Sequence, residues 1–333
     1  MHQEQISKGS FPFINKFIYD SEYFTIMIKI TSKLTKSIES QLDCRILSHK
    51  PLGNGEHNVN FLLDTTKGNF VLRIYANVQF DNSEKEYKIL KKLNGKYAPK
   101  VYYFDNSKSN FKYDYMIQEF IDGITLKKFS DNDLKNVAKI MKEIHQIKDL
   151  TKNREWKEPI GSWSKKNILQ NSKYLGDEFH NEMKQLYSKV LKELEQIKSL
   201  ISKYDRVHLI HDDIIPENTI KTKEGNLVLI DWELATFEYF FFEFGCMIAE
   251  NHLTKKQEEV FLKEYNFGLK PNEKKIVHAI KINRILSLIS WLIERIASIK
   301  QGKKIFVGEN ISKYQNRLKK EIEHIYELLS EKI

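Results

Sequence analysis

The sequence has little cysteine and no long hydrophobic run. Its two cysteines, Cys44 and Cys246, lie far apart and in no metal-ligand spacing, so we expect neither a disulfide framework nor a zinc site. No run of about 18 apolar residues is present, which argues against a membrane span. Residues 1–20 contain acids and amides and lack the apolar segment of a signal peptide, so we expect a cytoplasmic protein.

The sequence also lacks a concentrated basic segment, although its formal net charge is +9. Lysines alternate with glutamates over residues 184–203 and 319–332, which is typical of solvated helical faces. Because a nucleic-acid-binding protein gathers Lys and Arg on one face, we expect no nucleic-acid partner. An anionic small ligand such as a nucleotide accounts for part of the positive charge.

The distribution of strand and helix patterns divides the chain into three parts. Residues 1–40 are a polar lead-in followed by a helix. Residues 41–121 contain short β-rich runs separated by Gly and Asn turn signals, and residues 122–333 are mainly helical with one small β insert. We therefore predict an α+β protein of two lobes, a small antiparallel-sheet N-terminal lobe and a larger, mainly helical C-terminal lobe.

Two helices have clear local signals. Residues 83–94 carry an apolar stripe, and Ser83 can cap the N-terminus of that helix. Residues 130–149 are amphipathic, with apolar side chains on one face. We expect the first helix to interrupt the small sheet and the second to begin the helical lobe.

The strongest chemical signal is "HDDIIPENTI", residues 211–220, followed by "LIDWE", which contains Asp231. Phosphoryl transfer needs a group that accepts the hydroxyl proton and oxygen ligands that hold Mg²⁺ on the phosphates, and Asp213, Asn218 and Asp231 can supply both. A hairpin turning at "KTKEGN" would return Asp231 to the loop that holds the other two. The alternative is an ordinary polar loop in which Pro216 forms a turn.

The order of these residues is more specific than an acidic loop. The pattern His-x-Asp-x-x-x-x-Asn followed by Ile-Asp-Trp-Glu resembles the aminoglycoside phosphotransferase and choline kinase superfamily, which is related to protein kinases. The resemblance implies a protein-kinase-like fold, ATP and Mg²⁺ as cofactors, and a small-molecule alcohol as substrate. It implies Asp213 as catalytic base, Asn218 and Asp231 as Mg²⁺ ligands, and His211 as organiser of the catalytic loop.

A second block, residues 230–250, is similar to the choline and ethanolamine kinase branch without a gap. The residues that fit this pattern are Trp232, Glu233, Tyr239, Phe242 and Gly245. The block departs from the branch at Glu243, where the branch has Asp. Asp212 is a second departure, since that branch has Asn and aminoglycoside kinases have Gly.

The N-terminal lobe carries weaker signals for nucleotide binding. "LGNGEHNVNF" lies between two predicted strands, where kinases place a loop over the ATP phosphates, and the family loop aligns with Asn54, Gly55 and Asn58. A plain hairpin turn explains the same letters. The segment "MIQEFIDGITL" resembles the connection between the two lobes of the family, which implies that the backbone of residues Glu119 to Ile121 hydrogen-bonds adenine. An ordinary last strand has the same pattern.

Arg73 in "FVLRIY" occupies the strand position where protein kinases carry the phosphate-pairing Lys, and choline kinase-like enzymes often use Arg there. A guanidinium binds phosphate oxygens through two parallel N–H groups. By the resemblance its partner is Glu86, with Glu84 as the second choice. A surface Arg and an exposed helical Glu are the alternatives.

The substrate is less well specified by the sequence. A quaternary ammonium group would need aromatic faces, which Phe237, Tyr239, residues 240–242 and Trp291 can provide, although much of the Phe run must be core. From the resemblance of residues 230–250 to the choline and ethanolamine kinase branch, we favour choline, ethanolamine or a similar amino alcohol, with Glu233, Tyr239 and Trp291 as substrate contacts. An aminoglycoside or sugar is the alternative, and a nucleotide-binding pseudokinase or an atypical protein kinase is less favoured.

Overall fold

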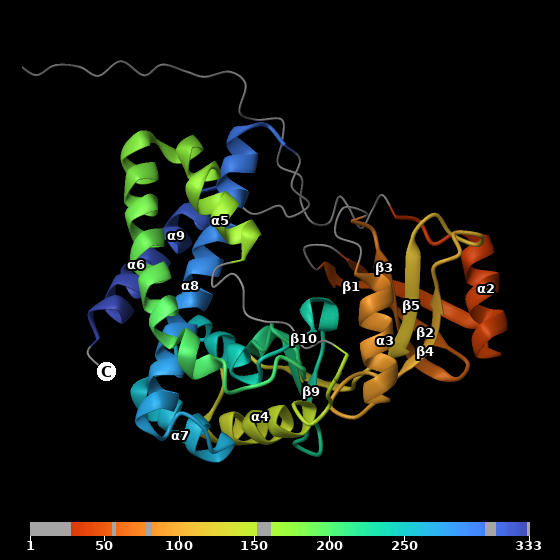
Figure 1. Cartoon of the computed structure of the whole chain (residues 1–333). Coiled ribbons are helices and arrows are strands. Elements are labelled where there is room, and N and C mark those ends of the chain that lie inside the picture. Colours follow the sequence, from red (N-terminus) through yellow and green to blue (C-terminus); the bar gives the residue numbers. More distant parts are fainter. Residues whose placement is uncertain (1–27, 55–57, 78–81, 152–160, 304–310, 332–333) are drawn as a thin grey trace, which may run out of the picture.

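The computed structural model describes residues 28–54, 58–77, 82–151, 161–303 and 311–331. In this part of the chain a small lobe built on a sheet lies beside a larger helical lobe (Figure 1). The small lobe consists of α2 (Ser32–Leu42), β1 (Ile46–Asn54), β2 (Val59–Thr65), β3 (Gly68–Tyr75), α3 (Ser83–Leu93), β4 (Val101–Asp105) and β5 (Asp114–Glu119). The α+β fold with two lobes is as predicted.

The five strands of the small lobe form one antiparallel sheet in the order β1-β2-β3-β5-β4. Successive side chains of a strand alternate between its faces. Leu72 and Ile74 of β3 share a core with Leu34 and Ile38 of α2, whereas Arg73 points to the opposite face, toward α3. The helix that we grouped with the N-terminal extension therefore packs as part of the small lobe.

Helix α3 differs from the prediction in how it begins. Its N-cap is Asn82, whose side chain makes no capping hydrogen bond, and Ser83 instead donates its hydroxyl hydrogen bond to Asp114 at 2.5 Å. Acidic residues in the first turn and lysines in the last turn complement the helix dipole. The polar positions at the start of α3 are therefore used for packing on β5, so Ser83 is not the cap.

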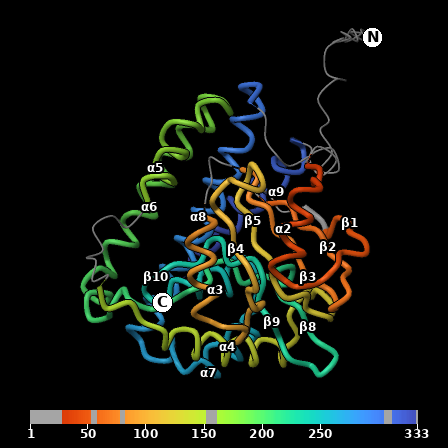
Figure 2. Tube along the Cα trace, turned by 90° about the vertical axis from the view of Figure 1, so that its right-hand side faces the viewer, coloured from red at the N-terminus to blue at the C-terminus, as the bar shows by residue number. Residues whose placement is uncertain are grey.

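The large lobe begins with β6 and is otherwise mainly helical. Its helices are α4 (Asp131–Ile144), α5 (Ser162–Leu169), α6 (Asp177–Ile201), α7 (Lys255–Tyr265), α8 (Pro271–Lys300) and α9 (Ile311–Ser330). Its strands are β6 (Gly123–Thr125), β7 (His208–Ile210), β8 (Thr219–Thr222), β9 (Leu227–Leu229) and β10 (Thr236–Glu238). Figures 1 and 2 both place α4 and α7 together at one end of this lobe.

Helix α4 begins at a capping box in which Ser130 and Asp133 bond each other's backbone N–H groups. The helix ends at Ile144, earlier than the predicted 149, because the chain then turns to pair Lys148 with His208. Helix α8 crosses the centre of the lobe. In the described part of the chain it alone is long and apolar enough to cross a membrane, but 72% of its apolar window is buried in the lobe, as in a core helix.

The small strands of the large lobe form two separate sheets. β8 and β9 form the predicted hairpin, with β6 on the other side of β8. β7, which precedes the catalytic motif, pairs with β10 and not with β9. The short 3-10 turn η3 (Pro216–Asn218) ends at the motif residue Asn218, and a second one, η4 (Trp232–Leu234), begins directly after Asp231.

Candidate active site

His211 organises the loop between β7 and η3 from a completely buried position. Its Nε2 lies 3.0 Å from the carbonyl oxygen of Ile230, and its Nδ1 accepts the Asp213 N–H at 3.3 Å. Nε2 therefore carries the proton, because Nδ1 acts as an acceptor. Burial lowers the pKa of His211, which favours this neutral form.

Asp213 and Asn218 contact each other directly. The Asn218 Nδ2 donates to Asp213 Oδ2 at 2.7 Å and to the Asp213 carbonyl at 3.1 Å. Burial and the charge of Glu250 raise the pKa of Asp213 to about 7, against the opposing charge of Arg284. A carboxyl with a pKa near neutrality is suited to accept a proton from a hydroxyl group.

Asp231 is brought to this loop by the β8–β9 hairpin. The Ile230 N–H donates to the Asn218 carbonyl at 2.9 Å, so the residue after it lies beside the motif loop. Asp231 has a φ of 64°, which turns the chain from β9 into η4. The structure thus brings Asp213, Asn218 and Asp231 together. Since Asn218 uses its Nδ2 on Asp213, its Oδ1 and the Asp231 carboxylate are the oxygens suited to Mg²⁺.

Arg73 connects the two lobes at this point. Its Nη2 lies 2.5 Å from Asp231 Oδ1 and 3.2 Å from Glu233 Oε2. Its Nε lies 3.2 Å from Oε2 of Glu86, so the predicted ion pair is present. Glu84, the second choice, is exposed and pairs with Lys88. A guanidinium held from three sides by carboxylates is fixed in position before any phosphate binds.

The phosphate-loop residues are only partly described. Gly55 lies outside the described residues, and Asn54 ends β1. Asn58 is buried, and its Nδ2 donates to Glu233 Oε2. Burial and the charge of Asp231 raise the pKa of Glu233. Glu233 was expected to contact the substrate. The structure places its carboxylate against the small lobe, beside Asn58 and Arg73.

The segment expected to meet adenine joins β5 to β6. The Glu119 N–H donates to the Lys100 carbonyl at 2.8 Å, and its carboxylate accepts the Lys100 N–H at 3.1 Å. The N–H of Glu119 is thus engaged in the sheet, because its strand pairs with β4. Ile121 follows the strand and is half-buried between the lobes' sheets. Backbone contacts of Ile121 to adenine stay a prediction.

The expected aromatic residues do not form one box. Tyr239 is buried and stacks on Phe241 with ring centroids 5.1 Å apart, and Phe241 is completely buried. Phe240 stacks on Tyr265 of α7 and contacts Phe267, as core aromatics do. Trp291 comes from another element, α8.

The ring of Trp291 packs edge-on against Tyr314 of α9, at 5.7 Å between centroids. The guanidinium groups of Arg295 and Arg317 lie over the Trp291 ring at 5.5 Å and 5.6 Å. The face of the Trp291 ring, which could bind a substrate cation, thus contacts cations of the protein itself. A role for Trp291 in substrate binding stays a prediction.

Sequence reasoning missed the central role of Glu243, which it noted only as a departure from the family pattern. This carboxylate is completely buried. Its Oε1 accepts the N–H groups of His211 at 2.6 Å and Asp212 at 3.0 Å, and its Oε2 lies 2.6 Å from His145 Nε2. The other ring nitrogen of His145, Nδ1, lies 2.7 Å from the Tyr265 hydroxyl. Glu243 therefore fixes the backbone of the catalytic loop.

A second missed residue is Arg284, which lies three residues after Lys281 on the largely buried helix α8. Its Nη1 lies 3.3 Å from Asp212 Oδ1, its Nη2 lies 3.7 Å from Asp213 Oδ1, and its Nε donates to Glu250 at 2.7 Å. The sequence offered a signal in that Lys281 and Arg284 interrupt an apolar stretch, and a buried charge needs a partner. Arg284 faces the candidate base from the large lobe, as Arg73 faces Asp231 from the small lobe.

Gly245 explains how Glu250 comes so close to α8. It begins the π-helical turn η6 (Gly245–Glu250) after the Phe run. A Cβ at this position would lie 2.8 Å from Arg284 Cβ and 2.9 Å from the Ile280 carbonyl oxygen, so only glycine fits without movement. The turn carries Glu250 to the guanidinium of Arg284.

Comparison with known proteins identifies the family. Residues 48–276 match the model of the phosphotransferase enzyme family. A protein LicA homolog of Mycoplasma capricolum is 26% identical over 215 residues, which are 64% of this chain and 77% of that protein.

Solved structures share the fold. Choline kinase LicA from Streptococcus pneumoniae has a TM-score of 0.58 at 21% identity, covering 88% of this chain and 98% of its own. A spectinomycin phosphotransferase in complex with ADP and spectinomycin has a TM-score of 0.64 at 12% identity, covering 89% and 97%. The chain therefore belongs to the phosphotransferase enzyme family and is a kinase that acts on a hydroxyl group.

Proposed function

We propose that this protein transfers the γ-phosphoryl group of ATP to the hydroxyl of a small cationic alcohol. The observation that carries the proposal is the meeting of two sets of groups between the lobes. Arg73 and Asn58 come from the small lobe, and Asp213, Asn218 and Asp231 come from the large lobe. Phosphoryl transfer depends on positioning and charge stabilisation, and these groups supply both.

In this proposal Asp213 accepts the proton of the attacking hydroxyl. Asn218 holds the Asp213 carboxylate in place, and neutral His211 holds the backbone of the loop. The raised pKa of Asp213 suits this role because its carboxylate is a stronger base than an exposed one. Arg284 limits that rise, so that the group still ionises near neutral pH.

The phosphates would lie against Arg73. Its guanidinium now bonds Asp231, and phosphate oxygens would take the place of that carboxylate. Mg²⁺, bound through Asn218 Oδ1 and Asp231, would neutralise phosphate charge during transfer. Glu86 would keep Arg73 in position during the exchange, since its contact is to Nε and not to Nη2.

The acceptor side of the site is acidic, which favours a cationic alcohol. Asp212 and Glu250 lie around Arg284 next to the base. We favour choline, ethanolamine or a similar amino alcohol, with Tyr239 and Trp291 as contacts, and the LicA relatives support this choice. The aminoglycoside alternative is favoured by the same carboxylates, because several ammonium groups need several partners. A cytoplasmic location is part of the proposal.

A panel assay tests the proposal. ATP consumption with Mg²⁺ is measured for choline, ethanolamine, aminoglycosides and sugars, and we expect saturable turnover with an amino alcohol. Turnover with aminoglycosides or sugars alone would contradict the favoured substrate class. Absence of turnover across the panel, with nucleotide binding retained, would favour a pseudokinase.

The role of Asp213 is tested separately. We expect Asp213→Asn to lower kcat by at least about 100-fold, the usual contribution of a general base, with nucleotide affinity and melting temperature nearly unchanged. Asp64→Asn removes the same charge from an exposed position on β2 and is the matched control. A retained rate in Asp213→Asn would overturn the assignment.

A further inference from the structure

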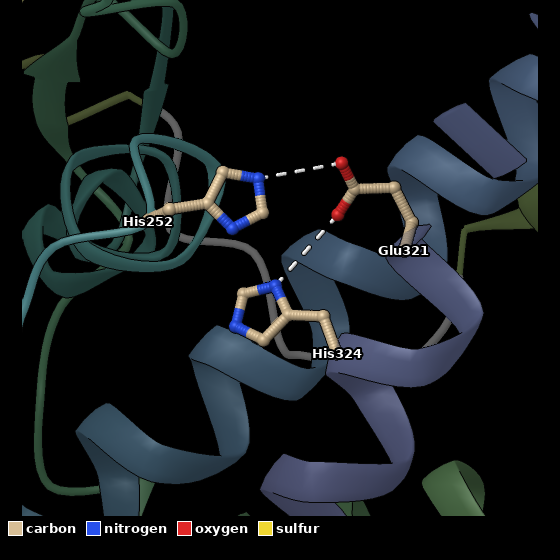
Figure 3. Close-up of side chains that lie close together, drawn as sticks. All are labelled: His252, Glu321 and His324. Atoms are coloured by element: carbon tan, nitrogen blue, oxygen red, sulfur yellow. Dashed lines mark ion pairs between the residues drawn. The ribbon is translucent and has the colours of Figure 1, made fainter. Parts of the chain in front are cut away.

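Two histidines and a glutamate meet in the large lobe, away from the groups assigned to phosphoryl transfer. His252 lies just after the η6 turn, whereas Glu321 and His324 lie one helical turn apart on α9. Figure 3 shows all three side chains pointing toward one another. His252 Nε2 is 3.5 Å from Glu321 Oε1, and His324 Nδ1 is 3.7 Å from Glu321 Oε2.

These contacts are too long to satisfy the groups as hydrogen bonds. Within the described residues, Glu321 Oε2 and His324 Nδ1 are buried and have no hydrogen-bond partner. The Glu321 side chain is only 3% exposed. Buried polar atoms in folded proteins nearly always have a partner, and a missing ion is one reason for an orphaned atom. Both atoms face the space between the three side chains.

The spacing matches the ligand set of a transition metal. One ligand atom from each residue can be chosen such that all three lie within 4.8 Å of one another. Around a tetrahedral zinc ion with bonds of about 2.0–2.1 Å, neighbouring ligand atoms lie about 3.3 Å apart. The contacts of His252 and His324 to Glu321, at 3.5 Å and 3.7 Å, are close to this value, and they go to different oxygens of the carboxylate. The side chain of His252 is half exposed, so its rotation can bring the imidazole to the distance that a bound metal requires.

We infer that His252, Glu321 and His324 form a site for a borderline divalent transition metal such as Zn²⁺, with water in the remaining position. Imidazole nitrogen and a carboxylate are ligands that Zn²⁺ accepts, whereas Mg²⁺ prefers oxygen alone. The site fastens α9 to the turn that carries Glu250. Its role is structural, because the three ligands do not contact the candidate base.

One cation lies next to the site and must be accommodated. Arg317 Nε is 3.9 Å from Glu321 Oε1, and its Nη2 is 3.6 Å from Glu250 Oε1. Arg317 is nearly half exposed, so it can turn fully toward Glu250 when a metal binds Glu321. Metal binding at this site therefore strengthens the contact between α9 and the η6 turn.

Calorimetric titration of the chelator-treated full chain with Zn²⁺, in the presence of excess Mg²⁺, tests the site. We expect one zinc per chain and a higher melting temperature with zinc. His252→Asn and Glu321→Gln should each weaken zinc binding by at least about 10–100-fold, because the loss of a residue that only hydrogen-bonds a metal ligand already lowers metal affinity by that factor. Asn is chosen at 252 because it tolerates the positive φ of 49° found there.

Two controls make the result specific. His49→Asn removes an exposed histidine of β1 and should leave zinc binding unchanged. Asp213, Cys246 and Glu250 form a second group that can hold an ion, so Asp213→Asn is titrated as well. Zinc binding of equal affinity in the wild type and His252→Asn, or binding that only Asp213→Asn removes, would overturn the inference. Because His252 is half exposed, His252→Asn keeps the test valid should Glu321→Gln fail to fold.

Discussion

Replacing Glu243 by alanine should both destabilise the protein and disorganise its catalytic loop. The carboxylate is completely buried and receives the N–H groups of His211 and Asp212 together with a bond from His145. Each hydrogen bond to a charged group is worth about 1.5–3 kcal/mol, and its loss leaves the donor unpaired. Since such terms do not add fully, we expect Glu243→Ala to lower the free energy of unfolding by about 3–5 kcal/mol.

Glu243→Gln is the matched comparison. The glutamine carbonyl can still accept both backbone N–H groups, and its NH₂ can donate to His145 Nε2 when the His145 proton is on Nδ1. That tautomer donates to the Tyr265 hydroxyl, which lies 2.7 Å away. The loss of charge alone should then cost about 1–2 kcal/mol. Urea unfolding at neutral pH measures both values, and kcat should fall more in the alanine variant.

The effect of pH follows from the pKa of Glu243. Burial opposes ionisation, but the hydrogen bonds that the Glu243 carboxylate makes with His145 and with the Asp212 N–H outweigh it and lower the pKa of Glu243. A lowered pKa stabilises the fold above the unfolded-state value of about 4.3, and this contribution is lost as pH falls through the folded-state pKa. The difference in the free energy of unfolding between the wild type and Glu243→Gln should therefore stay constant near neutral pH and become smaller in acid. An alanine variant within about 1 kcal/mol of the wild type would refute the reasoning.

Three further predictions concern the charged groups around the site. Arg73→Ala leaves the buried Glu86 carboxylate without its cation, although the hydrogen bond from the Tyr75 hydroxyl remains, and should cost about 3–5 kcal/mol in chemical unfolding. Arg73→Lys should cost less, and equal losses in the two variants would contradict the ion pair. Arg284→Gln removes the cation that holds down the pKa of Asp213, which is about 7 in the wild type. The acidic limb of the pH profile of kcat/KM should therefore move to higher pH by roughly 1 unit or more. If this limb does not move, Asp213 is not the titrating base. Gly245→Ala should lower stability by about 1–3 kcal/mol through the clash with α8, measured against Gly161→Ala, whose Cβ meets no atom within 4 Å.

Much of the fold follows from local signals. The small antiparallel sheet, the helix from 83 and the helical lobe are set by hydrophobic periodicity and turn residues, which act within a few positions. The boundaries were less certain because packing decides them: α4 ends at Ile144, where the chain turns to pair with His208, and Ser83 packs on Asp114 instead of capping.

For the candidate site, the sequence by itself determined the motif residues, because one loop and one hairpin bring them together. These residues are His211, Asp213, Asn218 and Asp231. Resemblance added the pair of Arg73 with Glu86. Only the tertiary structure decided the partners that come from distant segments, Glu243 on the loop backbone, Arg284 beside the base, and His252 facing α9. A buried charge needs a partner in space, and no short-range sequence pattern specifies which distant segment will provide it.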